Sequence, residues 1–441
     1  MIGSRDGGNT AASRRHRRVA LSLGAAILLP SIAFATQQPM SSDAANAQLP
    51  AAIRNLGPGH STLHAANAGV ACDGSTDNTK ALQNAVLLAQ QLAFPQSGLG
   101  GARLELPAGF CVISGPIQIT SGLTIEGAGI GGGVGYGNSG GTIIRTTSPN
   151  SDVFTVMSDG AVVFSNLQID SIVGKTSGAG ISINGGSSST ANLGTRINGV
   201  RITKMYNAVA LGNAFGWKIR DSIFQDFQNV GVLLTASSTF SDGSLGGSLL
   251  DGNTIVDLNV GGSNACVEIQ GGGDIAVSKN KILGSHFGVS LNLKHGPTGT
   301  LLISTNSFEE QKGANIALTQ SVQGMEYGNV VITGNELLQL KNVPTFGEIY
   351  IGTGTPVAAA RWLRHVVISD NVIGAGQGTP IPNGLIQIND GTDIVLSSNV
   401  LSADGNPSTV GVWVGPNARN VKVSTSNIMG DMPAGLGVTP Q

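Results

Sequence analysis

The 441-residue chain carries 24 Lys and Arg against 26 Asp and Glu, and only 11% of its residues are charged. This balance provides no basic stripe, which excludes a nucleic-acid-binding surface. Gly accounts for 65 residues and 40% of the chain is hydrophobic. Intrinsic disorder is therefore excluded, and many tight bends are expected.

The N-terminal segment has the pattern of a secretory signal peptide. A cluster of arginines precedes an apolar run that starts at Val19, and Ala33-Phe34-Ala35 supplies an A-x-A cleavage site. We predict a signal peptide over 1–35, a linker over 36–65, and a secreted or periplasmic protein. Removal of the signal peptide takes away five Arg and one Asp, which shifts the net charge from −2 to −6. The apolar run is too short to span a bilayer, and no later segment resembles a transmembrane helix.

Residues 66–130 are predicted to form an N-terminal cap and the first coils of a repeat. Apolar residues in Lys80–Ala89 have helical spacing, and Asp77 or Thr79 is the candidate N-cap. A single helix in front of a repeat suits a plug over the open apolar end of a solenoid.

Three cysteines allow two interpretations. In an exported protein, a disulfide between Cys72 and Cys111 would tie down the N-terminal end, and Cys266 would be left over. The alternative is that all three are buried free thiols. The chain has no C-x-x-C pair, so a structural zinc site is not expected.

The remainder, predicted as a parallel β-helix over 131–441, repeats a short phrase that begins near Gly122. An apolar residue is followed three positions later by an anchor and two positions after that by another apolar residue. The clear copies have Asn at the anchor: Asn253, Asn280, Asn306, Asn335, Asn371 and Asn399. The weaker copies have other residues there: Ala128, Leu167, Val200, Ser222 and Ser426. Successive anchors are separated by 22 to 39 residues, which is typical of a stacked repeat.

Each repeat also contains a second short run rich in Val and Ile, such as Gly231–Leu234, and no convincing long helix. This pattern predicts an all-β fold, a parallel β-helix solenoid of about eleven coils with a short N-terminal capping helix. Asn tolerates a left-handed bend, and stacked anchors form a ladder of amides. The anchors are therefore predicted to be structural.

Four stretches resemble the opening of the pectate-lyase superfamily: Asp73-Gly-Ser-Thr-Asp-Asn-Thr, Ala81-Leu-Gln-Asn-Ala, Leu106-Pro-Ala-Gly and Ile125-Glu-Gly-Ala-Gly. The resemblance implies a single-stranded right-handed β-helix that faces a carbohydrate. The polygalacturonase motifs of that group are absent, and the nearest approach, Ser285-His286-Phe287-Gly288, departs from Gly-His-Gly. No catalytic residue is carried over, because this fold serves several chemistries.

Register along the coils predicts two columns of candidate catalytic side chains. Four positions after the anchor lie Asp226, Asp257 and Glu310, with the first two about 5 Å apart. A close pair of carboxylates suits glycoside hydrolysis, and repulsion between them raises one pKa. The alternative interpretation places these residues in ordinary solvated turns.

The second column lies on the outward side of the second run. Its candidate catalytic residues are Glu268, His286 and Lys294. Its candidate substrate-binding residues are Gln270, Asn292, His295 and Tyr350, and the insertion Gly352–His365, which is expected to overhang the groove, adds Arg361 and Arg364. Such side chains bind sugar hydroxyls or a uronate carboxylate, and Tyr350 offers a ring for stacking. Outward polar residues on any strand look similar, which is the alternative.

Together these patterns predict an exported polysaccharide-degrading enzyme that cleaves a uronate-containing polysaccharide by β-elimination or hydrolysis. Elimination requires a base and a cation that neutralises the uronate carboxylate. We therefore expect Ca²⁺ as a cofactor only if the protein is a lyase, with Asp226, Asp257 and Glu268 as ligands. The alternative is a non-catalytic carbohydrate-binding or cell-surface protein. The expected partner is a polysaccharide and not a nucleic acid, and the oligomeric state stays open.

Overall fold

The computed structural model describes residues 62–92, 102–131, 140–184, 191–235, 247–258, 262–294, 299–320, 326–339, 344–352, 363–376, 381, 384–403 and 409–430. The predicted signal peptide, His295 and Arg361 lie outside these residues. The fold begins at β1 (Thr62–His64), which pairs in parallel with β3 (Ala102–Glu105). The last four residues of the predicted linker therefore belong to the fold. None of the described helices is long and apolar enough to cross a membrane.

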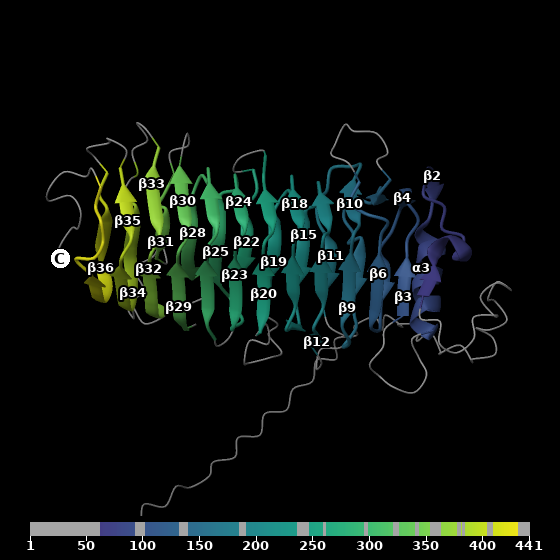
Figure 1. Ribbon diagram of the computed structural model, residues 1–441, viewed down its shortest axis with the longest axis horizontal. Helices are drawn as coiled ribbons and strands as arrows, with labels where there is room; N and C mark the ends of the chain where they lie inside the picture. The colour runs from purple at the N-terminus through teal and green to yellow at the C-terminus, as the bar shows by residue number, and fades with distance from the viewer. Residues whose placement is uncertain are drawn as a thin grey trace, which may run out of the picture. The chain divides into compact units, whose positions relative to one another are not determined.

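Parallel strands stack coil upon coil and form three faces (Figure 1). After β1 and β3, the first face contains β6 (Leu123–Glu126), β9 (Val162–Ser165), β13 (Arg196–Asn198), β17 (Lys218–Arg220), β20 (Ser248–Asp251), β23 (Ile275–Ser278), β26 (Leu301–Ser304), β29 (Tyr327–Thr333) and β32 (Leu363–Ser369). Two long strands, β34 (Ile386–Ser397) and β36 (Val412–Val423), complete it.

The second face follows the anchor and is a twelve-stranded sheet among the described residues. Its strands are β2 (Asp73–Asp77), β4 (Gly109–Ile113), β7 (Thr142–Thr146), β10 (Gln168–Ser171), β14 (Arg201–Thr203), β18 (Ile223–Gln225), β21 (Thr254–Val256), β24 (Lys281–Leu283), β27 (Ser307–Glu309), β30 (Glu336–Gln339), β33 (Val372–Ala375) and β35 (Val400–Ser402). The number agrees with the predicted solenoid of about eleven coils.

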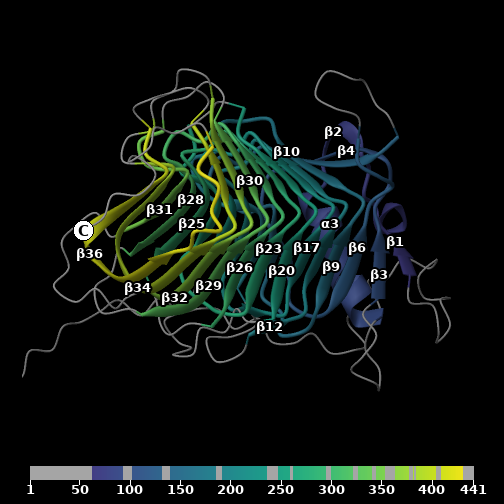
Figure 2. The same ribbon diagram turned by 60° about the vertical axis from the view of Figure 1, so that its left-hand side comes forward.

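The third face completes each coil. It contains β5 (Ile117–Ile119), β8 (Phe154–Val156), β11 (Ala179–Ile183), β15 (Asn207–Leu211), β19 (Val230–Leu234), β22 (Ala265–Ile269), β25 (Phe287–Leu293), β28 (Ala314–Gln320) and β31 (Ile349–Ile351). The first halves of β34 and β36 extend it, so these two strands join the first and third faces. Figure 2 shows β25, β28 and β31 side by side on one face and β29, β32 and β34 on the next.

Alternation of side chains along each strand places the core inside the coils. In β20, β23 and β26 buried residues alternate with half-buried ones, as the two-residue period of a strand requires. The inward residues Leu250, Val277 and Ile303 are essentially inaccessible. A minor pair, β12 (Asn192–Leu193) and β16 (Ala214–Phe215), lies outside the three faces.

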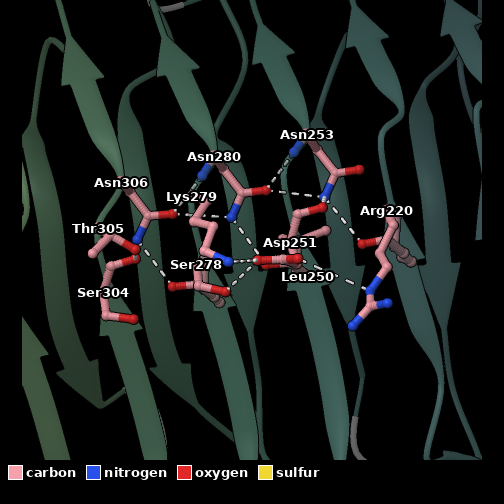
Figure 3. A network of polar contacts seen from close by, with 12 residues as sticks. Arg220, Leu250, Asp251, Asn253, Ser278, Lys279, Asn280, Ser304, Thr305 and Asn306 are labelled. Atoms are coloured by element: carbon pink, nitrogen blue, oxygen red, sulfur yellow. Dashed lines mark hydrogen bonds and ion pairs between the residues drawn. The ribbon is translucent and has the colours of Figure 1, made fainter.

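The predicted amide ladder is confirmed and connects every coil from the middle of the chain onward. Each anchor Oδ1 accepts hydrogen bonds from the backbone N–H and the Nδ2 of the preceding anchor; between Asn280 and Asn306 both are 2.9 Å (Figure 3). Each Nδ2 also donates to a backbone carbonyl, as from Asn306 to Val277 at 2.9 Å. The last anchor is Asn427, to which Asn399 donates, and not the predicted Ser426. After Ala128 the second face resumes only at Thr142, whose hydroxyl accepts from the Ala128 N–H at 2.8 Å.

At each corner the residue before the anchor has the left-handed backbone conformation. The prediction had placed this conformation at the anchor itself. Lys279, Thr305 and Asp370 have φ values of 54°, 55° and 58°. A bend one residue before the anchor turns the Asn side chain into the coil, where its amide is fully paired. Buried amides with all their partners are the expected outcome for a polar residue inside an apolar solenoid.

The N-terminal end is closed as predicted by a helix, α3 (Thr79–Leu92), which follows a short 3₁₀ helix, η1 (Ala65–Ala68). Its buried face is made of Leu82, Ala85, Val86 and Ala89. Asp77 caps the helix, since its carboxylate accepts from the Thr79 backbone N–H at 2.9 Å. Of the two interpretations of the cysteines, a disulfide joins Cys72 to Cys111, while Cys266 is a buried free thiol whose pKa burial raises to about 12.

Candidate functional site

A pocket of about 420 Å³ opens on the third face across β19, β22, β25 and β28. Its lining is mostly polar: Asn229, Leu233, Asn264, Ala265, Glu268, Gln270, His286, Phe287, Ser290, Asn292, Lys294 and Thr319. Five residues predicted as catalytic or substrate-binding therefore share one concave surface. A hollow lined by convergent polar side chains is the general form of a ligand site.

Glu268 lies at one end of this pocket and is the shared acceptor of three neighbours. Its Oε1 accepts from Gln270 Nε2 at 2.7 Å, from Asn292 Nδ2 at 3.3 Å and from Lys294 Nζ at 3.4 Å. The Glu268 residue is only 9% exposed, whereas the Lys294 side chain is 35% exposed. A carboxylate so held has a defined orientation and its oxygens face the pocket.

Strand register explains this grouping. Glu268 is paired with Leu233 on the preceding coil and with Ser290 on the next. Side chains two residues apart on one strand share a face, so Gln270 lies beside Glu268. Because β25 is longer than β22, Asn292 and Lys294 reach the same surface from the following coil.

The other end of the pocket carries amides and an imidazole. Asn264 Nδ2 donates to Asn229 Oδ1 at 2.5 Å, and Asn229 Nδ2 donates to Asn207 Oδ1 at 2.9 Å. Ala265 and Phe287 are register partners on adjacent coils. The residues directly before them, Asn264 and His286, therefore lie next to each other in one column. Burial, and secondarily the charge of Lys312, lowers the pKa of His286, so the imidazole is neutral at neutral pH.

Gly313 makes room for this imidazole. A Cβ added there would lie 2.7 Å from Phe287 Cε1 and 2.9 Å from His286 Nε2. Any side chain at 313 would therefore displace the ring that lines the pocket. Strand β25 separates His286 from Lys294 and is about 20 Å long at ~3.3 Å per residue. The two cannot act on the same atom, although sequence reasoning offered both for one reaction.

Tyr350 is not the exposed stacking platform that was predicted. Only 3% of it is accessible, because its ring stacks on Phe346 with centroids 4.3 Å apart, and Phe346 in turn stacks near Phe287 at 6.3 Å. Ala314 and Ala317 pack beneath these rings. Small residues on the intervening coil let large rings close over the outward face. Sequence reasoning missed Phe346, since it lies before the strand and outside the column.

Arg364 lies away from the pocket on the first face, where its guanidinium pairs with Glu326. Among the lining residues, Asn229, Asn264, Ser290 and Thr319 were not predicted as site residues. The register columns that identified Glu268 also contain Ser290, so that signal was available. Asn229 and Asn264 lie in turns before the strands, where no periodic pattern marks them.

The predicted column of Asp226, Asp257 and Glu310 has the expected register, because Gln225, Val256, Leu283 and Glu309 pair in sequence across the coils. Burial raises the pKa of Asp226, and the charge of Asp257 adds to the increase. Asp257 is 1% exposed, and its Oδ2 accepts from the Ser263 N–H at 3.0 Å and the Ser263 hydroxyl at 2.7 Å. Its carboxylate closes the turn into β22, which leaves this pair outside the pocket lining.

One buried acid was not anticipated. Glu348 is 1% exposed and lies inside the coil just before β31. Burial raises its pKa to about 8, with a further contribution from Glu310. No group of three His, Cys, Asp or Glu that could hold a metal occurs among the described residues. A Ca²⁺ site made of the three carboxylates predicted from sequence is therefore not assembled in the described part of the chain.

No protein-family model and no curated protein sequence matches this chain. Solved structures do match. The catalytic unit of the GH87 α-1,3-glucanase from Streptomyces thermodiastaticus aligns with a TM-score of 0.58 at 15% identity, covering 84% of this chain and 69% of that one. The A-module of the Azotobacter vinelandii mannuronan C-5 epimerase AlgE4 aligns with a TM-score of 0.54 at 17% identity, covering 80% and 98%.

The tailspike of E. coli bacteriophage HK620 gives a TM-score of 0.57 at 14% identity, covering 84% of this chain and 67% of that one. These identities are too low to transfer an activity, but they agree with the parallel sheets described above. The chain has the right-handed parallel β-helix fold that the sequence resemblance implies. Because this fold hosts several chemistries, the function must be argued from the pocket.

Proposed function

We propose that this protein is an exported enzyme that cleaves a uronate-containing polysaccharide by β-elimination, with Glu268 as the base. The observation that carries the proposal is the 3.4 Å contact between Glu268 Oε1 and Lys294 Nζ at the pocket surface. In a uronate the proton that is removed and the carboxylate are both attached to C5. A base and a cation that serve this reaction must therefore lie side by side.

In the proposed step Glu268 takes the C5 proton while Lys294 faces the uronate carboxylate. The electrons of the C5–H bond form a C4=C5 double bond, the C4–O bond breaks, and the departing oxygen takes a proton from solvent. The amides of Gln270 and Asn292 donate to Glu268, and in the proposal the second hydrogen of each amide serves the uronate carboxylate. Stabilisation of the developing negative charge by fixed donors is the main contribution such a site makes.

Hydrolysis is less well supported by the pocket. It requires two carboxyl groups on either side of the scissile bond, whereas Glu268 is the one carboxylate among the described lining residues. The predicted pair of Asp226 and Asp257 does not supply the second one, because Asp257 is buried in its turn. The neighbour named a C-5 epimerase favours the same carbon as the site of proton removal.

At the far end of the pocket, Asn229, Asn264 and the neutral His286 provide hydrogen-bond donors and acceptors for sugar hydroxyls. The distance from Glu268 is long enough that these residues would bind a different sugar of the same chain. They are proposed as substrate-binding residues, which moves His286 from the catalytic to the binding group.

The test incubates the purified protein with a panel of uronate-containing and neutral polysaccharides, with and without Ca²⁺. Ultraviolet absorbance of the unsaturated product and new reducing ends are followed together. We expect both signals to rise with a uronate polymer. Reducing ends without absorbance would indicate hydrolysis and contradict the proposal. A folded protein that binds a polymer without either signal would favour the non-catalytic carbohydrate-binding alternative, which the amide-rich lining also suits.

A further inference from the structure

A polar cluster separate from the Asn ladder lies inside the coils, at the corner between the second and third faces. We call it the polar corner and define it as Gln311, Asn315, Gln339 and Glu348, each at most 1% exposed. Gln311 and Asn315 belong to one coil and Gln339 and Glu348 to the next. On the following coil the register partner of Gln339 is Ala375. The repeat therefore does not require a polar residue here, although Asp257 and Ser285 are also buried at this corner on the two preceding coils.

Two hydrogen bonds join these residues across the two coils, and the nitrogen donors of the three amides are used. Asn315 Nδ2 donates to Glu348 Oε2, and Gln339 Nε2 donates to the backbone carbonyl of Gln311 at 2.6 Å. Gln311 Nε2 donates to the carbonyl of Ile282 at 3.3 Å. One oxygen of each side chain is left over: Gln311 Oε1, Asn315 Oδ1, Gln339 Oε1 and Glu348 Oε1 have no hydrogen-bond partner among the described residues.

Four unpaired buried acceptors on adjacent coils call for a common partner. Each costs about 1–3 kcal/mol when it has none, so their accumulation at one corner is unusual for a native interior. An anion is excluded as the partner, because the leftover atoms are all acceptors. Without a cation, burial keeps Glu348 protonated, and water would have to supply the remaining hydrogens. A bound cation would instead hold the carboxylate in its ionised form. A cation satisfies the oxygens and the carboxylate together.

We propose that the polar corner is an internal binding site for a hard cation of the calcium class. Calcium takes six to eight oxygen ligands, and Asn and Gln carbonyl oxygens and a carboxylate are among those it accepts. The cation would join two successive coils from the inside, next to the third-face strands that carry the pocket. Its role is to stabilise this part of the solenoid, and it stands independently of the proposed elimination reaction.

The test measures calcium content and thermal unfolding of the full chain after treatment with a chelator. We expect that added Ca²⁺ is taken up at one ion per chain and raises Tm with concentration, as ligand binding to the native state requires. In Gln339→Ala, which installs the residue of the next coil, both the uptake and the Tm response should be lost. Glu348→Gln, which removes the charge, should behave in the same way.

Two control variants locate the ion. Glu309→Gln changes a partly buried carboxylate at the surface of the same coil as Gln311 and should keep the full calcium response. Glu268→Gln should also keep the calcium response, because the proposed ion lies at the polar corner. Loss of the response in this variant would instead place the ion in the surface pocket. Absence of uptake by the native protein would overturn the proposal. So would an equal Tm response in native protein and Gln339→Ala, a variant expected to fold even if Glu348→Gln does not.

Discussion

The anchor corner and the Glu268 pocket are both built from columns of polar side chains on adjacent coils, yet they behave in opposite ways. At the corner the same residue recurs, so each Asn is satisfied by its own copies and is sealed from solvent. In the pocket column the residue changes at every coil, from Leu233 to Glu268 to Ser290. Glu268 therefore finds partners two residues along its strand and on the next coil, and the pocket stays open.

A second comparison sets two ion pairs side by side. Lys281 and Glu309 lie 3.6 Å apart on the second face, and Lys294 and Glu268 lie 3.4 Å apart on the third. The Glu309 side chain is 28% exposed and that of Glu268 only 12%. An exposed pair contributes little because water screens it. Enclosure by neighbouring amides, more than the pair itself, distinguishes the third-face site.

The largest expected effect follows from removing the base. Glu268→Gln should lower the rate of elimination by about 10²–10⁴-fold, the usual contribution of a positioned general base. Glu309→Gln is the matched control and should leave the rate unchanged. Initial rates of ultraviolet absorbance on the substrate found in the panel measure both, with circular dichroism to confirm folding. Equal rates in the two variants would remove Glu268 from the reaction.

Breaking the ladder should cost stability and not activity. In Asn306→Ala the N–H and Nδ2 of Asn280 lose their acceptor, and the Val277 carbonyl loses a donor. At about 1–3 kcal/mol for each unsatisfied buried group, we expect the free energy of unfolding to fall by about 3 kcal/mol or more. Denaturant titration would measure it. Asn198→Ala, at an exposed Asn of β13, should change stability by no more than about 0.5 kcal/mol.

The N-terminal cap offers a smaller effect. The Cys72–Cys111 disulfide closes a loop with a sequence separation of 39 residues. Replacing both cysteines with Ser should lower the free energy of unfolding by about 2–4 kcal/mol, chiefly by freeing the unfolded chain. Urea unfolding with and without reductant provides the measurement. If reductant lowers the urea midpoint of the native protein but not that of the double variant, the effect belongs to this disulfide.

The smallest effect concerns pH. The pKa of His286 is lower in the folded protein than its ordinary value of 6.5, so the unfolded chain binds this proton more readily. Its contribution to stability is present above pH 6.5 and is lost as pH falls through the lowered pKa. Substrate binding by the neutral ring should weaken over the same range. KM against pH should show this limb in the native protein and not in His286→Gln.

Several features could be predicted from the residues because they repeat or are local. The Asn anchors recur at a period that only a stacked coil explains. The helical spacing of apolar residues predicts the helix after Asp77. The outward position of Glu268 follows from counting along a strand. Register alone placed Glu268, Gln270, Asn292 and Lys294 on adjacent coils, and the structure brings their side chains into contact.

Other features depended on packing across coils. Tyr350 is outward by register but buried, because Phe346 folds over it. Asp257 has the right register for a catalytic pair, yet its carboxylate accepts hydrogen bonds from the Ser263 N–H and hydroxyl inside a turn. The unpaired oxygens of the polar corner arise from side chains on two coils that share no sequence motif. Periodicity determined by itself the β-helix and the column in which each residue lies. Only the tertiary structure decided which members of a column face water, because that depends on the size of neighbours from other coils.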